Sequence, residues 1–244
     1  MIYIFIFLLL LYLSFHYDIC GKTKGRDFWY YTILVALVLL AGLRYRLGID
    51  TPNYIEHFYH DIPTIDQLTL EDLSIGRKPL WILINSTILS FGGRYFIVQI
   101  IEAAFVNILV FKYVKRHSRF EFTCIFFYYL CMYSALSFVA MKAALSIVLC
   151  LFANDYVNQK QWFKAYVLYI LAILFHPQAI VIMLTPLFLF LRFNKKSVVL
   201  FVFLFFIGFE IQKILGDYLM LLDLADDAIA GKVENVANTD RYSS

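Results

Sequence analysis

The chain has 244 residues, of which 62% are hydrophobic and only 16% are charged, and its formal net charge at pH 7 is +3. Soluble domains carry about 45–50% apolar and about 25% charged residues, so this composition excludes an ordinary soluble domain. Hydrophobic runs recur along the whole chain and lack the alternating pattern of a membrane β-barrel. The sequence therefore predicts an all-α, polytopic helical membrane protein.

The hydrophobic runs define the expected spans. The first, residues 1–17, lacks a basic segment and a small-residue cleavage site, so we interpret it as a retained helix and not as a signal peptide. Seven more runs follow, at 28–43, 95–114, 120–138, 141–157, 162–176, 178–191 and 197–215. We expect about eight transmembrane helices in a single domain over residues 1–215, followed by an acidic, polar tail over 216–244. Trp29, Trp81 and Trp162 lie at or near run ends, as interface anchors do.

The run over residues 79–91 is different, because a spanning helix needs about 20 residues, with a lower limit near 17. It also carries Asn85, Ser86 and Thr87. We expect a short re-entrant or interfacial helix there.

Basic residues predict the orientation. They form four clusters, namely Lys22/Lys24/Arg26, Lys112/Lys115/Arg116/Arg119, Lys160/Lys164 and Arg192/Lys195/Lys196, and the positive-inside rule assigns such clusters to the cytoplasm. All four can be inside only if 79–91 enters and leaves on one face, with both termini outside. In a rival topology 79–91 spans, and Lys22, Lys24 and Arg26 lie outside. The charge counts nearly tie, and we prefer the first topology because of what it collects on the outer face.

That outer face gathers an unusual set of polar residues: Arg44, Arg46, Asp50, Tyr54, Arg77, Lys78, Arg94, Lys142 and His176. Lys142 opens an apolar helix, where its charge opposes the helix dipole and where a bound anion would be held by free N–H groups as well. A lysine that snorkels to the interface is the alternative. His176 precedes Pro177 in the middle of a long apolar stretch, and an ionisable residue there is a functional candidate. A histidine hydrogen-bonded to a helix end is the alternative.

The stretch Arg44-Tyr-Arg46 is either a pair of stop charges after the second run or part of an anion site. Arginine's fork fits phosphate oxygens, and the following Gly48, Asp50 and Pro52 indicate a turn. Asp50 is also a candidate N-cap of a short helix beginning at Thr51–Pro52, which does not exclude a second role. Together the cations and the recessed histidine predict a site for a lipid-linked phosphate.

Four stretches resemble a known family. "GLRYRLGIDTPNYIEHF" is similar to the signature near the start of the EpsG family, which is related to Wzy-type polysaccharide polymerases. "RKPLWILINSTILSFGG", "SFVAMKAALSIVLCLFANDYV" and "LAILFHPQAIVIML" resemble its later motifs in the same order. Two departures stand out: Lys142-Ala143 where the family usually has Arg-Gln, and Lys78 where it often has Glu. Family members usually continue through further helices, so the tail over 216–244 is interpreted as the start of a truncated extracytoplasmic loop.

The resemblance implies a glycosyltransferase-type polymerase of capsule, exopolysaccharide or O-antigen in the cytoplasmic membrane of a bacterium. Its substrate would be a polyprenyl-diphosphate-linked oligosaccharide, surrounded by membrane lipids, and polysaccharide assembly and chain-length proteins are candidate partners. Arg44, Arg46 and Lys142 would stabilise the leaving diphosphate, Tyr54 and Lys78 would help bind it, and Asp50 or His176 would be the base. We expect no cofactor, no metal and no nucleic acid. A lipid-linked sugar flippase and an inactive truncated member are the alternatives.

Overall fold

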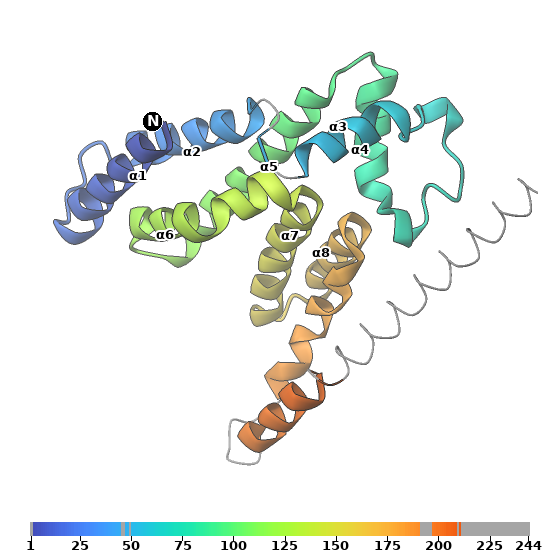
Figure 1. Ribbon diagram of the computed structural model, residues 1–244. Coiled ribbons are helices and arrows are strands. Elements are labelled where there is room, and N and C mark those ends of the chain that lie inside the picture. Colours follow the sequence, from blue (N-terminus) through green and yellow to red (C-terminus); the bar gives the residue numbers. More distant parts are fainter. Residues whose placement is uncertain (1, 45–46, 49, 191–196, 209, 211–244) are drawn as a thin grey trace, which may run out of the picture. The chain divides into compact units, whose positions relative to one another are not determined.

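The computed structural model describes residues 2–44, 47–48, 50–190, 197–208 and 210. In this part of the chain every regular element is a helix, which confirms the all-α prediction (Figure 1). The described residues fall into two units that divide between Pro186 and Leu187, and each is described by itself.

The first unit contains eight α-helices, several of which continue as short π- or 3-10 segments. They are α1 (Ile2–Leu13) with η1 (Ser14–Ile19), α2 (Arg26–Gly42), α3 (Thr51–His60), α4 (Pro79–Ser90), α5 (Tyr95–His117), α6 (Glu121–Tyr128) with η4 (Tyr129–Tyr133) and η5 (Ala135–Val139), α7 (Met141–Asn158) and α8 (Trp162–Phe175). The 3-10 segments η2 (Ile65–Gln67) and η3 (Ile75–Arg77) lie between α3 and α4. The runs predicted as helices thus appear as helices.

The region after α8 departs from the expected regular spans. The run at 178–191 forms 3-10 helices, η6 (Pro177–Ile180) and η7 (Ile182–Phe190), with Pro186 inside η7. A proline removes a backbone donor and clashes with the preceding turn, which disfavours an α-helix here. In the second unit, Ser197–Gly208 is a short apolar helix. The predicted boundary at residue 215 and the tail over 216–244 lie outside the described residues.

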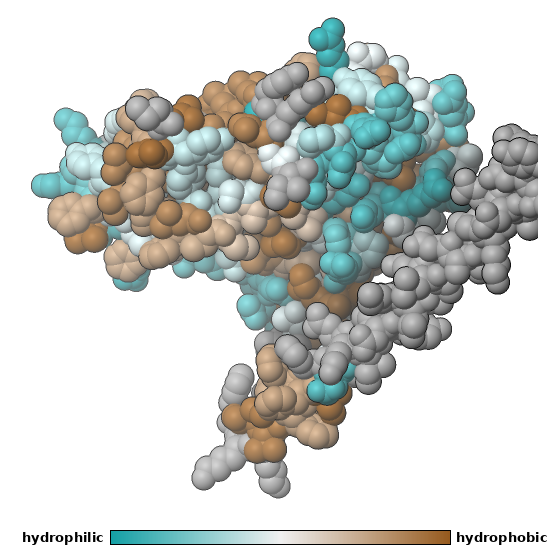
Figure 2. All heavy atoms as spheres, viewed as in Figure 1, coloured by the Kyte–Doolittle hydropathy of each residue, from teal (hydrophilic) through white to brown (hydrophobic). Residues whose placement is uncertain are grey.

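The outer surface of the helices is apolar. Among the described residues, Ile2–Ile19 and Tyr95–His117 are long and apolar enough to cross a membrane, and α2 has 17 residues. Large side chains such as Phe5, Phe28 and Phe163 are exposed, and apolar residues cover much of the visible surface in Figure 2. Exposed apolar area on this scale marks contact with lipid or partners and indicates a membrane protein. The count of eight spans stays a prediction.

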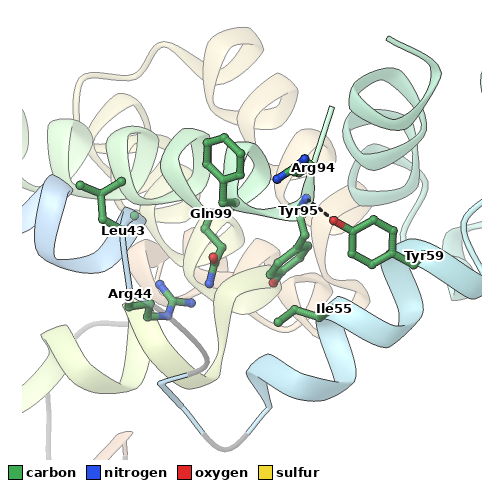
Figure 3. A pocket seen from close by; sticks show the side chains of 9 residues that line it. Leu43, Arg44, Ile55, Tyr59, Arg94, Tyr95 and Gln99 are labelled. Carbon is green, nitrogen blue, oxygen red and sulfur yellow. Dashed lines mark hydrogen bonds between the residues drawn. The ribbon is translucent and has the colours of Figure 1, made fainter. Parts of the chain in front are cut away.

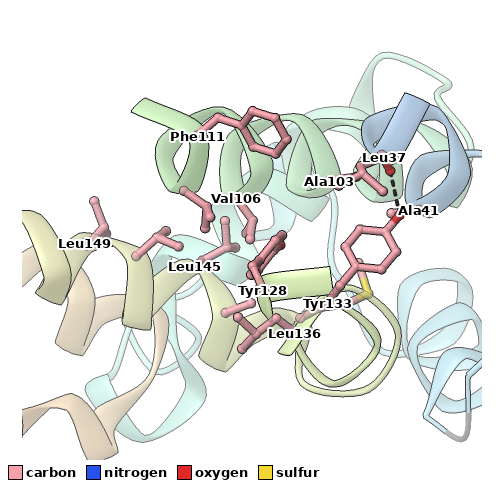
Figure 4. Close-up of a cluster of buried hydrophobic side chains, with 14 of the residues drawn as sticks. Leu37, Ala41, Ala103, Val106, Phe111, Tyr128, Tyr133, Leu136, Leu145 and Leu149 are labelled. Atoms are coloured by element: carbon pink, nitrogen blue, oxygen red, sulfur yellow. Dashed lines mark hydrogen bonds between the residues drawn. The ribbon is translucent and has the colours of Figure 1, made fainter. Parts of the chain in front are cut away.

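The core of the first unit is built around α5. Ala103 and Val106 of α5 are completely buried, and Figure 4 shows side chains from α2, α7 and the segment after α6 gathered against this helix. The Tyr133 hydroxyl donates to the carbonyl of Leu37 in α2 at 2.6 Å, and the Tyr128 hydroxyl donates to Oδ1 of Asn107 in α5 at 3.2 Å. These buried tyrosines satisfy their polar ends while filling the space between helices.

One end of the α2, α5 and α7 group carries two basic clusters, in which Arg26, Lys115 and Arg116 pair with acids. A guanidinium nitrogen of Arg26 donates to the carbonyl of Arg119 at 2.9 Å, and the Lys115 ammonium pairs with Asp27 at 2.6 Å. The clusters at 22–26 and 112–119 therefore share one end, which we call the basic end. The rival topology, which separates them across the membrane, is incompatible with this arrangement.

The opposite end, called the site end, contains both ends of α4. Lys78, just before α4, lies within electrostatic range of Lys142 at the start of α7. Tyr95, five residues after α4, donates its hydroxyl to Sδ of Met141 at 3.4 Å. A helix of 12 residues is about 18 Å long, well short of the roughly 30 Å hydrocarbon core. The geometry agrees with a short helix that enters and leaves on one face.

Candidate functional site

Arg44 anchors the segment after α2 against the junction of η5 and α7. Its guanidinium donates to the carbonyls of Ala41 at 2.7 Å and Leu47 at 3.2 Å and to Sδ of Met141 at 3.1 Å. It also lies 5.2 Å from the ring centre of Phe138. With a residue exposure of 5%, Arg44 is a buried structural cation and not an exposed stop charge. A guanidinium has five N–H groups, and two of them have no partner among the described residues.

Gly48 explains why a glycine stands in the Gly-x-Asp motif. Its φ is +110°, and an added Cβ would lie 2.2 Å from the carbonyl oxygen of Phe138 and 2.9 Å from Oγ1 of Thr51. Side chains rarely adopt this backbone conformation, and the Phe138 carbonyl belongs to the backbone, so it cannot swing away as a side chain would. The absence of a side chain thus lets Gly48 contact the Phe138 backbone of η5 directly.

Asp50 stands at the N-cap position of α3, where the sequence predicted it, but its side chain makes no capping hydrogen bond. Pro52 occupies the first turn, and the N–H of Tyr54 donates to the backbone carbonyl of Asp50. Among the described residues, the carboxylate of Asp50 makes no hydrogen bond or ion pair, which leaves it open to another role. Burial raises the pKa of the Tyr54 hydroxyl to about 12, and the charge of Asp50 contributes, so Tyr54 is neutral at pH 7. Its hydroxyl donates to the carbonyl of Val139 at 3.4 Å.

Lys78, Lys142 and His176 form what we call the cationic cluster. The Lys142 ammonium lies 5.1 Å from the ring centre of Tyr54 and 5.5 Å from that of Trp81, which are favourable cation–π distances. His176 lies within electrostatic range of both lysines. Its backbone N–H caps α8 through Ala172, whereas its imidazole makes no hydrogen bond among the described residues. Three predicted site residues from three elements are thus brought together.

Lys78 has an unusual backbone conformation. Its φ is +61° and ψ is +68°, the left-handed region that costs a non-glycine residue roughly 1–2 kcal/mol. Pro79 follows and opens α4. Such outliers often accompany functional sites, and here the turn directs the chain into α4 with a lysine at its N-cap.

Ion pairs occur at both ends of the helix group. At the basic end, Arg116 and His117 pair with Asp155 of α7 at 3.1 and 3.0 Å, and Arg26 pairs with Asp18 and Glu121. At the site end, Arg77 pairs with Glu71 and Asp72 in its own loop. Neither lysine of the cationic cluster has an ion-pair partner in the described part of the chain. Like charges gathered without a counter-ion are typical of a functional site.

The sequence interpretation missed three polar or aromatic neighbours. Trp81, expected at the interface, is 2% exposed and lies beneath Lys142. Glu102 of α5 is 2% exposed, lacks a hydrogen-bond partner on either carboxylate oxygen, and is within electrostatic range of Arg44. Gln99, one turn earlier, is also buried with an unpartnered amide nitrogen. A lone acid inside an apolar run is a functional candidate in its own right, so the sequence already pointed to Glu102.

A pocket of about 410 Å³ opens beside Arg44 (Figure 3). It is lined by Gly42, Leu43, Arg44, Ile55, Tyr59, Arg94, Tyr95, Phe96 and Gln99. The predicted site residue Arg46 lies outside the described residues. Within the described chain no group of three or more His, Cys, Asp or Glu side chains is arranged to hold a metal ion.

The fold and this site define a helical membrane protein with an unpaired cationic cluster at one end of its helices. The chain belongs to the EpsG family, because the family model matches residues 27–236, a range that includes every candidate site residue. EpsG is a family similar to Wzy-type polysaccharide polymerases, so the chain has a polymerase-like role in polysaccharide biosynthesis. Comparison with curated proteins and with solved structures found no match.

Proposed function

We propose that this protein is a polysaccharide polymerase that joins polyprenyl-diphosphate-linked repeat units on the outer face of the bacterial cytoplasmic membrane. One observation carries the proposal. Lys78 and Lys142 lie within electrostatic range of each other at the site end, and neither has an ion-pair partner among the described residues. An uncompensated pair of ammonium groups at membrane depth needs an anionic ligand, and a lipid diphosphate supplies it at that depth.

The chemistry follows from what the reaction does to charge. An acceptor hydroxyl attacks the anomeric carbon of the donor glycan, the bond from that carbon to the diphosphate oxygen breaks, and the diphosphate leaves with increased negative charge. Lys78 and Lys142 stabilise that charge, since fixed cations act most strongly where charge develops. Arg46, which lies outside the described residues, is expected to bind the same diphosphate. The energy is already stored in the lipid diphosphate, so no nucleotide is needed.

The proton of the acceptor hydroxyl goes to His176 or to Asp50. Partial burial, and then the charges of Lys78 and Lys142, disfavour the protonated form of His176 and favour the neutral imidazole that a base requires. The carboxylate of Asp50 is free of capping bonds and lies near Tyr54. Tyr54 and Trp81 flank the Lys142 ammonium and hold it in place over their rings.

The test is polymerisation by the full chain in lipid vesicles, with a lipid-linked repeat unit supplied on the site-end face. Lys78→Gln and Lys142→Gln are each expected to lower the rate of chain extension about 100- to 1,000-fold, the usual cost of removing one charge-stabilising donor. The matched control is Lys115→Gln, which removes a lysine already paired with Asp27 and should leave extension unchanged. His176→Gln and Asp50→Asn identify the base through the loss of one limb of the pH profile.

Two results would overturn the proposal. The first is polymer of normal length from correctly inserted Lys78→Gln and Lys142→Gln proteins. The second is transfer of intact lipid-linked units across the bilayer without any extension, which would indicate a flippase.

A further inference from the structure

The pocket beside Arg44 is separate from the cationic cluster, although both contact α3. Tyr54 of α3 contacts Lys142, while Ile55 and Tyr59 of the same helix line the pocket. The Tyr59 hydroxyl accepts the backbone N–H of Tyr95 at 3.5 Å, so α3 lies across the first turn of α5. The pocket volume of about 410 Å³ is in the range of ligand sites, about 300–1,000 Å³.

The polar groups of the pocket are chiefly hydrogen-bond donors. Gln99 is 4% exposed, its amide nitrogen has no partner, and Figure 3 shows its side chain directed toward Arg44. Among the described residues, two N–H groups of Arg44 have no partner, and the exposed Arg94 makes no ion pair or side-chain hydrogen bond. A buried amide without a partner costs free energy, and the pocket lining contains no acid. A ligand must therefore supply acceptor oxygens, most favourably negatively charged ones.

The rest of the lining is apolar and aromatic. Tyr59, Tyr95 and Phe96 form much of the wall, together with Leu43 and Ile55. A bare phosphate is served by many donors and gains nothing from aromatic rings, whereas a sugar ring has an apolar C–H face that packs on them. A polymerase must also hold an acceptor glycan next to its donor diphosphate, so a second subsite at the same end is required.

On the basis of the proposed function, we infer that this pocket binds an acidic sugar residue of the acceptor glycan, with a carboxylate facing Arg44, Arg94 and Gln99. The ring packs against the aromatic wall, and its neighbour along the glycan extends past α3 toward the cationic cluster. Arg94 and Gln99 are then specificity residues for the charged sugar.

The experiment uses the full chain in lipid nanodiscs and three probes: trigalacturonate, neutral maltotriose and farnesyl diphosphate. The native protein should bind trigalacturonate more tightly than maltotriose. Gln99→Leu and Arg94→Gln should each weaken trigalacturonate binding about 3- to 10-fold, the usual effect of losing one hydrogen-bonding partner, and leave farnesyl diphosphate binding unchanged. Lys142→Gln should do the reverse. Because Arg94 is exposed, Arg94→Gln keeps the test decisive even where Gln99→Leu folds poorly.

The outcomes distinguish this inference from the proposed function. Equal binding of the acidic and neutral trisaccharides overturns the acidic-sugar site. Loss of farnesyl diphosphate binding in Arg94→Gln overturns it too, because the pocket would then be part of the lipid diphosphate site. If the pocket variants behave as expected but Lys142→Gln binds farnesyl diphosphate normally, the sugar site stands and the donor-site proposal fails.

Discussion

Gly48 offers the sharpest test of why the Gly-x-Asp motif begins with a glycine. Replacing it with alanine forces a Cβ to within 2.2 Å of the Phe138 carbonyl oxygen at a φ of +110°. The backbone strain costs roughly 1–2 kcal/mol, and the overlap adds about 1–3 kcal/mol, as overpacking does elsewhere. The backbone at Gly48 must then move away from η5, which disturbs the hydrogen bond from Arg44 to the carbonyl of the neighbouring Leu47.

Two other glycines provide matched controls. Gly92 has a positive φ of +68° but nothing within 4 Å of an added Cβ, and Gly76 has neither a positive φ nor a close neighbour. Gly92→Ala therefore measures the strain alone, and Gly76→Ala measures a nearly neutral substitution. The free energy of unfolding should fall in the order Gly76→Ala, Gly92→Ala, Gly48→Ala.

The assay is the apparent melting midpoint of each detergent-solubilised protein, followed by size-exclusion chromatography. At about 2–4 °C per kcal/mol for a chain of this size, the overlap of about 1–3 kcal/mol should make Gly48→Ala melt roughly 2–12 °C below Gly92→Ala. Identical midpoints for these two variants would refute the claim that Gly48 contacts the Phe138 carbonyl.

Three further predictions concern the charged groups and the orientation. Lys78→Gly should keep or raise stability by up to about 1 kcal/mol, because glycine adopts the left-handed backbone freely, yet it should abolish long polymer; reduced stability in thermal melts would contradict this. Glu102→Gln should fold normally, since a neutral isostere relieves an unpaired buried carboxylate; a loss of about 3–5 kcal/mol in denaturation would instead reveal a charged partner of Arg44. In a cysteine-free background, an impermeant maleimide should label Glu56→Cys from outside and Gln161→Cys only from inside; labelling of both from one side would reject the topology.

The helices were predictable because apolar runs of this length leave few alternatives in a membrane. The short helix α4 was predictable from the same rule, since its run was too brief to span. The 3-10 character of the segment around Pro186 was not, because a hydrophobic run indicates burial in lipid or protein but not the pitch of the helix. The charge counts could not distinguish the two topologies. The argument against the rival one depends on a contact between residues far apart in the sequence, Arg26 and Arg119.

The site was predictable only in part. Motif spacing singled out Lys78, Lys142 and His176, which the fold brings within electrostatic range of one another from three elements; their role in a site stays a prediction. Arg44 was interpreted as a ligand contact, but most of its donors are used within the protein, and sequence cannot show how many N–H groups are already bonded. Glu102 and Gln99 were missed because both lie in the middle of an apolar run, whereas the candidates were sought at run ends. Only the fold shows that α5 lies beside Arg44.

The two lysines of the cationic cluster both stand at helix N-termini, where a positive charge lowers the stability of the fold. Lys78 stands at the N-cap of α4, and Lys142 is the second residue of α7, so each ammonium lies at the positive end of a helix dipole. Such a placement is unfavourable by about 0.3–1 kcal/mol per charge, and Lys78 adds backbone strain. A fold selected for stability alone would place acids at both positions. Two cations at two helix N-termini are instead complementary to a ligand with two adjacent negative groups, because N–H groups and ammonium then act on the same oxygens. A diphosphate has this charge distribution, and a single carboxylate does not, which is why the donor belongs at the cationic cluster and the acidic sugar in the pocket beside Arg44.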